Sequence, residues 1–240
     1  MLTYPQLSQF PLRKSYRTRT VVNQAADGSS VKLPDPAGGI IQWTLQYANL
    51  SDAELQSLQQ FFTAAEGQLN SFTFLDPTAN LLAWSDDLAN AVWTKAPFLN
   101  IAPGHISNSG QGPQSISQTL QVPGGYQYCV SVYVRSAAPV NVTLLLGTQR
   151  ATRAVGPEFS RISLSGTADS GLFGLELPAG AAIDLYGFQV EAQAAPSACK
   201  TSTTGGVYEG ARFRDDTFAF TTTDVNRHSA TVNIIYASHL

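Results

Sequence analysis

The chain has 240 residues, 13% of them charged, and a formal net charge of −3. This length can bury a sizeable core in one large or two ordinary domains, and we expect two. The small negative charge gives no electrostatic footprint for nucleic acid, so we expect no nucleic-acid specificity. Glycine, proline, serine and threonine are plentiful between short apolar runs, which is typical of a mainly β chain.

Residues 1–12 are interrupted by prolines and carry the aromatic residues Tyr4 and Phe10. We expect an extended arm whose aromatic side chains contact a partner, and the alternative is a frayed terminus. Residues 1–15 lack the cationic segment, apolar run and cleavage site of a signal peptide, and no stretch approaches the ~20 apolar residues that span a bilayer. The sequence therefore predicts no membrane span and folding in a cytoplasm.

Four cationic side chains cluster along a predicted strand at residues 15–23. They could face a charged partner, or they could keep an exposed edge strand from pairing with another chain. Further along, Asp27 and Gly28 predict a hairpin turn at residues 26–30 that leads to a short strand at residues 31–33. The four cations are Arg13, Lys14, Arg17 and Arg19.

Residues 41–77 are the best-specified part of the sequence and predict a strand, a helix and a second strand. Apolar and polar residues alternate over residues 41–47, which is the period of a strand with one buried face. Ser51 and Glu54 have the spacing of a capping box, in which each side chain satisfies a backbone N–H of the first turn. The sequence therefore predicts a helix over residues 51–65.

The predicted helix carries a single apolar stripe. Leu50 and Leu55 are spaced for a hydrophobic staple across its start, and Gly67 supplies a left-handed residue at its end. Phe72 and Phe74 then resume the strand alternation until Asp-Pro stops it. The stripe consists of Leu55, Leu58, Phe62 and Ala65.

This order of elements resembles the distal-tail and tail-tip proteins of tailed bacteriophages and of gene transfer agents. Their N-terminal half has an alternating strand, a Leu-Ser-Asp-x-Glu helix ending in Phe-Phe, a glycine, and then Phe-x-Phe-x-Asp-Pro. The same series is present at residues 43–77. A capped helix between two strands also occurs in many other α+β domains, and the match contains no reactive residue.

A second segment begins at residues 80–95, NLLAWSDDLANAVWTK. This run is similar to the opening of the carbohydrate-binding-module-like jelly rolls of phage tail and virion proteins, and residues 184–201 are similar to their close. Cys199 departs from the pattern, because such domains usually place an aromatic residue there. Strands separated by glycine and proline turns lie between the two motifs, as a two-sheet jelly roll requires. We expect them at residues 125–135, 140–146, 160–165 and 172–177.

The last 35 or so residues return to the texture of the first segment. Short strands are predicted at residues 211–213, 218–220 and 229–237. This segment has too few residues to bury a core alone. We therefore expect a discontinuous distal-tail domain, residues 1–77 with 205–240, and an inserted jelly roll at residues 78–204. The predicted fold class is mainly β: a split β-sandwich or barrel-like tail-hub domain with one α-helix, plus an inserted β-sandwich.

The sequence contains no recognisable catalytic constellation. His105, His228 and His239 have no Cys, Asp or Glu neighbours at ligand spacing, and Asp224, the nearest carboxylate to His228, lies in a predicted hairpin loop. There is no Gly-x-Ser-x-Gly elbow and no Walker loop. We therefore expect no enzyme activity, no cofactor and no metal.

Four other residues leave alternatives open. Cys129 and Cys199 are far apart in the sequence, so two buried thiols are favoured over a disulfide. Asp169 and Glu176 could bind calcium, although solvated surface carboxylates are the commoner arrangement.

Exposed aromatic side chains are the residues that would stack on sugar rings. Such residues more often pack in a jelly roll than contact a ligand, and Trp93 is assigned to the core because it ends the opening motif. The candidates for sugar binding are Trp84, Tyr126, Tyr128, Tyr133 and Tyr186.

The resemblance implies a structural protein of a phage or phage-like tail tip, assembled in the host cytoplasm and located in the virion. Its partners would be other copies of itself in a hexameric or trimeric ring, the tail tube protein and the tail hub. The jelly roll would face outward toward host surface glycans. The alternatives are a receptor-recognition lectin outside any tail ring and an accessory module of an enzyme.

Overall fold

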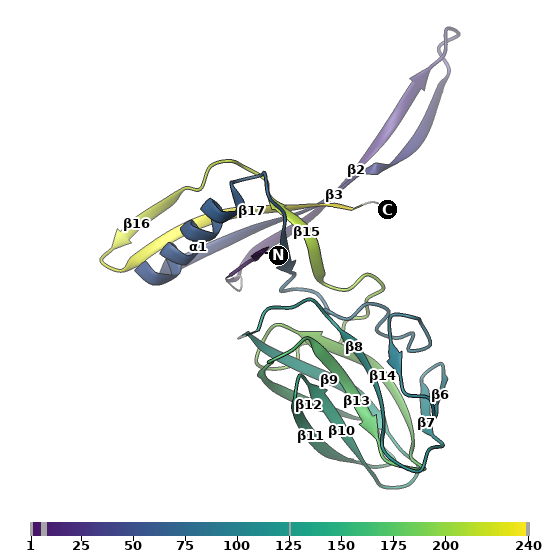
Figure 1. Ribbon diagram of the computed structural model, residues 1–240. Coiled ribbons are helices and arrows are strands. Elements are labelled where there is room, and N and C mark those ends of the chain that lie inside the picture. The colour runs from purple at the N-terminus through teal and green to yellow at the C-terminus, as the bar shows by residue number, and fades with distance from the viewer. Residues whose placement is uncertain (1, 6–8, 125, 239–240) are drawn as a thin grey trace. The chain divides into compact units, whose positions relative to one another are not determined.

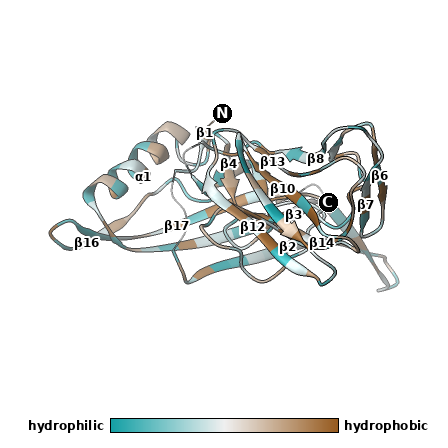
Figure 2. Ribbon diagram, turned by 90° about the horizontal axis from the view of Figure 1, so that it is seen from below, coloured by the Kyte–Doolittle hydropathy of each residue, from teal (hydrophilic) through white to brown (hydrophobic). Residues whose placement is uncertain are grey.

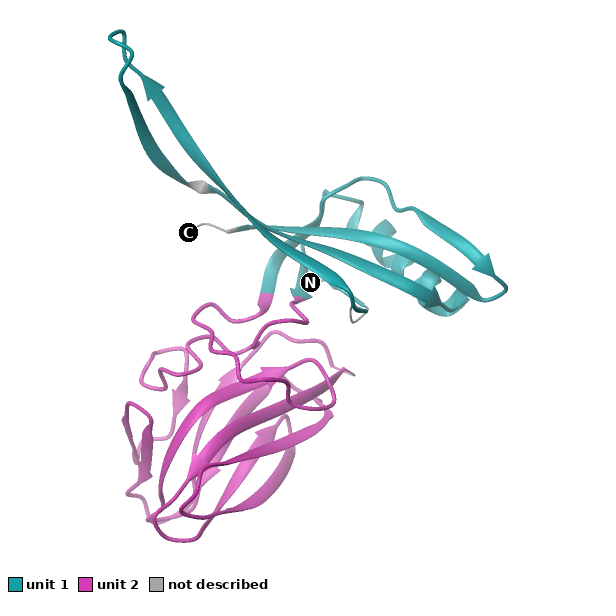
Figure 3. Ribbon diagram, turned by 180° about the vertical axis from the view of Figure 1, so that it is seen from behind, with its two compact units in different colours: residues 1–74, 208–240 teal, residues 75–207 magenta. Residues whose placement is uncertain are grey.

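The computed structural model describes residues 2–5, 9–124 and 126–238. The chain folds as two compact units (Figure 3): unit 1 is Met1–Phe74 with Tyr208–Leu240, and unit 2 is Leu75–Val207. Relative to the predicted boundaries, residues 75–77 and 205–207 belong to unit 2 rather than unit 1. The mainly β fold class with one helix in the described residues is confirmed.

Unit 1 contains a seven-stranded sheet and the helix α1, Asp52–Ala65 (Figure 1). The strand order is β1-β4-β15-β17-β3-β2, with β16 paired to β17. The C-terminal strands therefore complete a sheet that the N-terminal strands begin. The strands are β1 (Leu2–Thr3), β2 (Leu12–Gln24), β3 (Ser30–Leu50), β4 (Phe72–Leu75), β15 (Val207–Phe213), β16 (Phe220–Asp224) and β17 (Arg227–Ser238).

The capping box predicted for α1 is confirmed. Ser51 Oγ accepts the Glu54 N–H at 3.3 Å, and the Glu54 carboxylate accepts the Ser51 N–H at 2.8 Å. These bonds hold the pKa of Glu54 below its ordinary value. The chain leaves the helix through Glu66 and Gly67, both left-handed, with φ of 52° and 60°. In Figure 2 hydrophilic and hydrophobic residues alternate along α1, as in an amphipathic helix.

The buried stripe of α1 differs from the prediction at one position. Phe61, rather than Phe62, is the buried aromatic residue, because it lies between Leu58 and Ala65 on the same face. Phe62 is half-buried at the edge of that face, with its ring centroid 5.0 Å from that of Phe213.

Tyr4 does not belong to an exposed arm. Strand β1 pairs in parallel with β4, and this pairing carries Tyr4 into the core of unit 1, where it is 4% exposed. Its hydroxyl lies 3.0 Å from that of Tyr47, and its ring contacts Phe61 and Phe72. The prediction that Tyr4 contacts a partner is therefore wrong, because this side chain is buried in the core of its own chain.

Strands β2 and β3 form a hairpin that extends away from the rest of unit 1 (Figure 1). The predicted turn is present, with Gly28 at φ 85° and the Ala25 N–H bonded to the Ser29 carbonyl. The predicted short strand at residues 31–33 is instead the start of the 21-residue β3. Pro34 does not end β3. In a two-stranded ribbon each strand has one unpaired edge, and a residue whose N–H would point to that edge can be proline.

Lys14 and Arg19, two of the four predicted cations, have intramolecular partners. The Lys14 ammonium lies over the rings of Trp43 and Tyr208, 5.4 and 5.8 Å from their centroids, and Arg19 pairs with Asp35. Arg13 and Arg17 are exposed, and their contact with a partner stays a prediction.

Unit 2 is a β-sandwich of two five-stranded sheets around one core. One sheet has the order β11-β10-β13-β8-β5 and the other β12-β9-β14-β7-β6. The predicted strands are present, while β5, β6, β7, β8, β11 and β14 were not predicted individually. The strands are β5 (Thr94–Lys95), β6 (Leu99–Ala102), β7 (His105–Asn108), β8 (Gln114–Thr119), β9 (Gln127–Arg135), β10 (Val140–Leu146), β11 (Gln149–Val155), β12 (Ser160–Thr167), β13 (Leu172–Leu177) and β14 (Ala182–Glu191).

The opening and closing motifs of unit 2 are joined through Asn80, which is 1% exposed. Its side-chain amide donates to the carbonyls of Phe188 and Lys200 at 2.8 and 3.0 Å. Its side-chain oxygen accepts the N–H groups of Leu82 and Val190 at 3.1 and 3.0 Å. One buried side chain therefore satisfies four backbone groups from three segments.

Trp93 lies in the core of unit 2, as predicted, with its ring centroid 5.1 Å from that of Phe188.

The two ends of unit 2 lie side by side. The Asp76 N–H donates to the Gly206 carbonyl at 2.8 Å, and β4 and β15 are neighbours in the sheet order. The insertion therefore starts and finishes at one place in the fold.

Candidate binding surfaces

The outer face of the sheet β12-β9-β14-β7-β6 presents a group of exposed aromatic side chains. Along β9, Val132 and Val134 point into the core, so Tyr133 points outward. Tyr133 is directly opposite Tyr186 of β14. Their rings are parallel within 4°, with centroids 4.8 Å apart.

Phe159, which precedes β12, completes this group. Its ring meets that of Tyr186 edge to face with centroids 5.1 Å apart, and the two side chains are 41% and 49% exposed. We call Tyr133, Tyr186 and Phe159 the aromatic patch. Tyr133 is half-buried, and the Arg161 guanidinium lies 5.3 Å from its ring centroid. Tyr186 and Phe159 therefore provide most of the accessible ring surface.

A charged cluster adjoins the aromatic patch. Asp184, on the same strand as Tyr186, accepts from His105 Nδ1 at 2.8 Å and from Arg135 Nε at 2.9 Å, each through a different oxygen. These two bonds hold the pKa of Asp184 below its ordinary value. The Arg135 guanidinium also lies 4.6 Å from the ring centroid of Phe159. We call His105, Arg135 and Asp184 the Asp184 cluster.

The rest of this outer face is covered by the chain that follows β14. Ser131, Gln189 and Glu191 are buried although they point outward. Burial raises the pKa of Glu191, but hydrogen bonds from Ser197, Gln189 and Lys200 outweigh that effect and hold it below its ordinary value. Residues 197–200 bond Gln189 and Glu191 and cover this half of the face, whereas Tyr186 and Phe159 of the aromatic patch stay exposed.

The five sugar-binding candidates occupy different environments. Tyr128 is fully buried, and burial raises the pKa of its phenol, so its ring is unavailable for stacking on a sugar. Tyr126 is half-buried and packs against the core of unit 2. Trp84 is 41% exposed and lies on the segment that precedes β5. Its carbonyl accepts a hydrogen bond from Trp93 Nε1. Only Tyr133 and Tyr186 are brought together.

Sequence reasoning missed Phe159, Arg135, Asp184 and His105. The only local signal for Phe159 is a large aromatic residue beside a Gly-Pro turn. The other three residues come together through strand register, since Asp184 is opposite both Arg135 and His105.

Unit 2 also has a small cavity of about 280 Å³ between residues 86–89 and residues 101–104. Asp86 and Asp87 both line it, and Asp86 accepts the Gly187 N–H at 3.4 Å.

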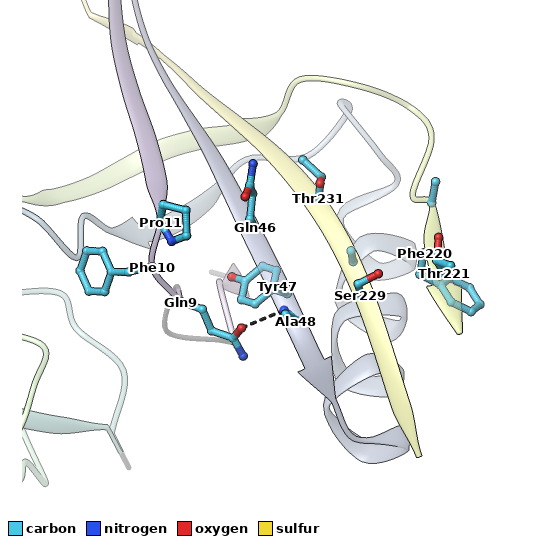
Figure 4. Close-up of a pocket in the computed structure, with 12 residues that line it drawn as sticks. Gln9, Phe10, Pro11, Gln46, Tyr47, Ala48, Phe220, Thr221, Ser229 and Thr231 are labelled. Atoms are coloured by element: carbon cyan, nitrogen blue, oxygen red, sulfur yellow. Dashed lines mark hydrogen bonds between the residues drawn. The ribbon is translucent and has the colours of Figure 1, made fainter. Parts of the chain in front are cut away.

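A second hollow lies in unit 1, on the outer face of its sheet (Figure 4). Its volume is about 580 Å³. Phe10 and Pro11 lie on one side, Phe220 lies on the other, and Gln9 accepts the Ala48 N–H at 2.8 Å. Phe10 is 73% exposed, and its contact with a partner stays a prediction.

The remaining candidates for chemistry have structural partners. His228 bonds Asp52 at 2.6 Å and Thr222 at 3.0 Å rather than Asp224, which is nearer in sequence. Asp169 accepts from Thr148. No group of three or more His, Cys, Asp or Glu residues in the described part of the chain could hold a metal ion. His239 lies outside the described residues.

Both cysteines are free. Cys129 is buried, which raises the pKa of its thiol, whereas Cys199 is exposed, so the prediction of two buried thiols is half right. No helix in the described ranges is long and apolar enough to cross a membrane.

No protein-family model matches the chain, and no curated protein sequence matches it. The resemblance of residues 43–77 to distal-tail proteins therefore stays a prediction.

Several solved structures are similar at low identity. One is TmCBM61 in complex with β-1,4-galactotriose, which is 13% identical to this chain. The match covers 48% of this chain and 99% of the TmCBM61 chain, with a TM-score of 0.36. The N-terminal cellulose-binding domain of Cellulomonas fimi β-1,4-glucanase C has 10% identity, coverage of 48% and 99%, and a TM-score of 0.36. The enzymatically active domain of bacteriophage CBA120 tailspike protein 4 has 12% identity, coverage of 48% and 22%, and a TM-score of 0.32. At these values the likeness carries no functional conclusion.

Proposed function

We propose that unit 2 recognises glycans and that unit 1 anchors it as a structural part of a phage-like tail tip. The observation that supports glycan recognition is the aromatic patch beside the Asp184 cluster on an open sheet face. Apolar ring faces and hydrogen-bonding side chains at one place are what a sugar requires, because a sugar presents both C–H faces and hydroxyl groups. The protein catalyses nothing in this proposal.

Tyr186→Ala should lower the affinity of the full chain for a glycan identified on an array by about tenfold or more, because it removes an exposed stacking surface. Tyr186→Phe should retain most of the affinity. Phe98→Ala is the matched control, since Phe98 is 54% exposed and lies outside the aromatic patch. Unchanged affinity of Tyr186→Ala, measured by calorimetry, would contradict this location of the site.

The proposal for unit 1 rests on the hairpin of β2 and β3. Val21 is paired with Leu33, and Asn23 with Val31, so the three apolar side chains lie on one face of the ribbon. They are 38%, 45% and 58% exposed. A two-stranded ribbon is marginally stable alone, and its free edges and apolar face favour pairing with another chain. A closed ring of copies would cover them without open-ended aggregation.

In this proposal the ring is a hexamer or a trimer that joins the tail tube protein to the hub, and the virion tail tip is its location. The runner-up is a lectin that acts outside any tail ring. The resemblance of residues 43–77 favours the tail assignment, and the aromatic patch is compatible with both.

Val21→Glu combined with Leu33→Glu should abolish ring assembly while leaving the protein folded, because charge is placed on the apolar face of an exposed hairpin. Val22→Glu is the control, since Val22 is 55% exposed on the opposite face. Assembly is measured by electron microscopy of particles reconstituted with tail tube and hub proteins. If the double variant assembles as the unchanged protein does, the hairpin makes no ring contact and the lectin becomes the better assignment.

A further inference from the structure

The Asp184 cluster offers more unused donors than unused acceptors. Both carboxylate oxygens of Asp184 already accept hydrogen bonds, one from His105 and one from Arg135. Arg135 uses Nε for this bond, and its terminal Nη groups have no hydrogen-bond partner among the described residues. Its side chain is 48% exposed. The unused polar capacity at this place is therefore mainly a guanidinium edge.

That guanidinium is held in position from two directions. The bond to Asp184 fixes its Nε end, and the ring of Phe159 lies 4.6 Å from its central carbon. A guanidinium presents planar paired N–H groups that match the geometry of a carboxylate. Because Arg135 is already restrained, less side-chain entropy is lost when it binds a ligand.

A second positive charge lies on the same face. Arg161 is half-buried against Tyr133, and its hydrogen bonds go to the Ser197 carbonyl and the Ser131 hydroxyl. It forms no ion pair within the described residues. Two other carboxylates lie near the patch, but both are engaged: Asp86 accepts the N–H of Gly187, and buried Glu191 is paired with Lys200. The exposed guanidinium of Arg135 therefore favours an anionic group on the ligand.

We infer that the sugar recognised here is acidic, with its ring against Tyr186 and Phe159 and its carboxylate on the Nη groups of Arg135. Uronic and sialic acids are the classes of sugar that fit. This inference rests on the proposed glycan recognition by unit 2. A neutral sugar would place only hydroxyl groups at Arg135, and these bond a guanidinium more weakly than a carboxylate does.

The test compares ligand pairs that differ chiefly in the carboxylate, titrated calorimetrically into the full chain. The pairs are trigalacturonic acid with galactotriose, and sialyllactose with lactose. We expect the acidic member of at least one pair to bind at least about tenfold more tightly, and this preference to weaken as salt is raised. Arg135→Gln should remove the preference, and Arg135→Lys should restore part of it. Arg227→Gln removes an exposed positive charge from unit 1 and should change nothing.

The outcomes separate the two claims. If neutral and acidic members bind equally, and Tyr186→Ala weakens both while Arg135→Gln weakens neither, glycan recognition stands and the acidic-sugar inference is overturned. If none of the four oligosaccharides binds the folded protein, both are overturned. Circular dichroism of each variant establishes that the protein is folded.

Discussion

Phe61→Ala should destabilise unit 1 by about 3–5 kcal/mol, the usual cost of truncating a buried phenylalanine. Phe61 is 8% exposed, and its ring meets those of Tyr4, Phe72 and Phe213 with centroids 5.6, 5.1 and 5.8 Å apart. Its removal leaves a cavity between helix α1 and the strands β4 and β15, which carry Phe72 and Phe213. Chemical denaturation followed by the helical circular-dichroism signal, to which α1 of unit 1 contributes, measures the loss.

Two variants test whether this effect is specific. Phe62→Ala should cost about half as much, because Phe62 is only half-buried. Gln60→Ala, on the exposed face of α1, should stay within about 0.5 kcal/mol of the unchanged protein. A larger loss for Phe62→Ala than for Phe61→Ala would mean that the helix is rotated relative to the face described here.

Asn80→Ala should destabilise unit 2 by about 3 kcal/mol or more, because it leaves buried backbone groups without hydrogen bonds. The orphaned groups are the carbonyls of Phe188 and Lys200 and the N–H groups of Leu82 and Val190. The measurement is the thermal unfolding transition of unit 2, followed by calorimetry.

Asn100→Ala is the matched control for Asn80→Ala. Asn100 is exposed on β6, so the same loss of an amide should change the free energy of unfolding by no more than about 0.5 kcal/mol. Equal effects of the two substitutions would show that Asn80 does not hold the opening and closing motifs together.

Local signals in the sequence predicted local structure well. The capping box at Ser51 and the alternation over residues 41–47 specify hydrogen bonds and faces within a few residues, and both are present. The last strands are too few to form a core alone, so we expected them to complete the first domain, and β17 pairs with β3. The position of Tyr4 could not be predicted, because it depends on the two-residue pairing of β1 with β4, which is distant in sequence.

The aromatic patch was predictable only in part. The positions of Tyr128 and Tyr133 on one strand differ by an odd number, so alternation alone places the two side chains on opposite faces. That parity could have excluded one of the two from an exposed site. The pairing of Tyr133 with Tyr186 depends on the register of β9 and β14, which includes a bulge after Tyr186, and no local signal specifies it.

The adjacent ends of unit 2 have a consequence for the order of folding. While unit 2 is unfolded, pairing β15 with β4 must close a flexible loop of about 130 residues, with an entropy cost of roughly 4 kcal/mol. Once unit 2 is folded, the bond between Asp76 and Gly206 already holds those ends together, and most of that cost is removed. Folded unit 2 thus holds the ends of β4 and β15 close to each other. A substitution that unfolds unit 2 should lower the stability of unit 1 although no residue of unit 1 has changed.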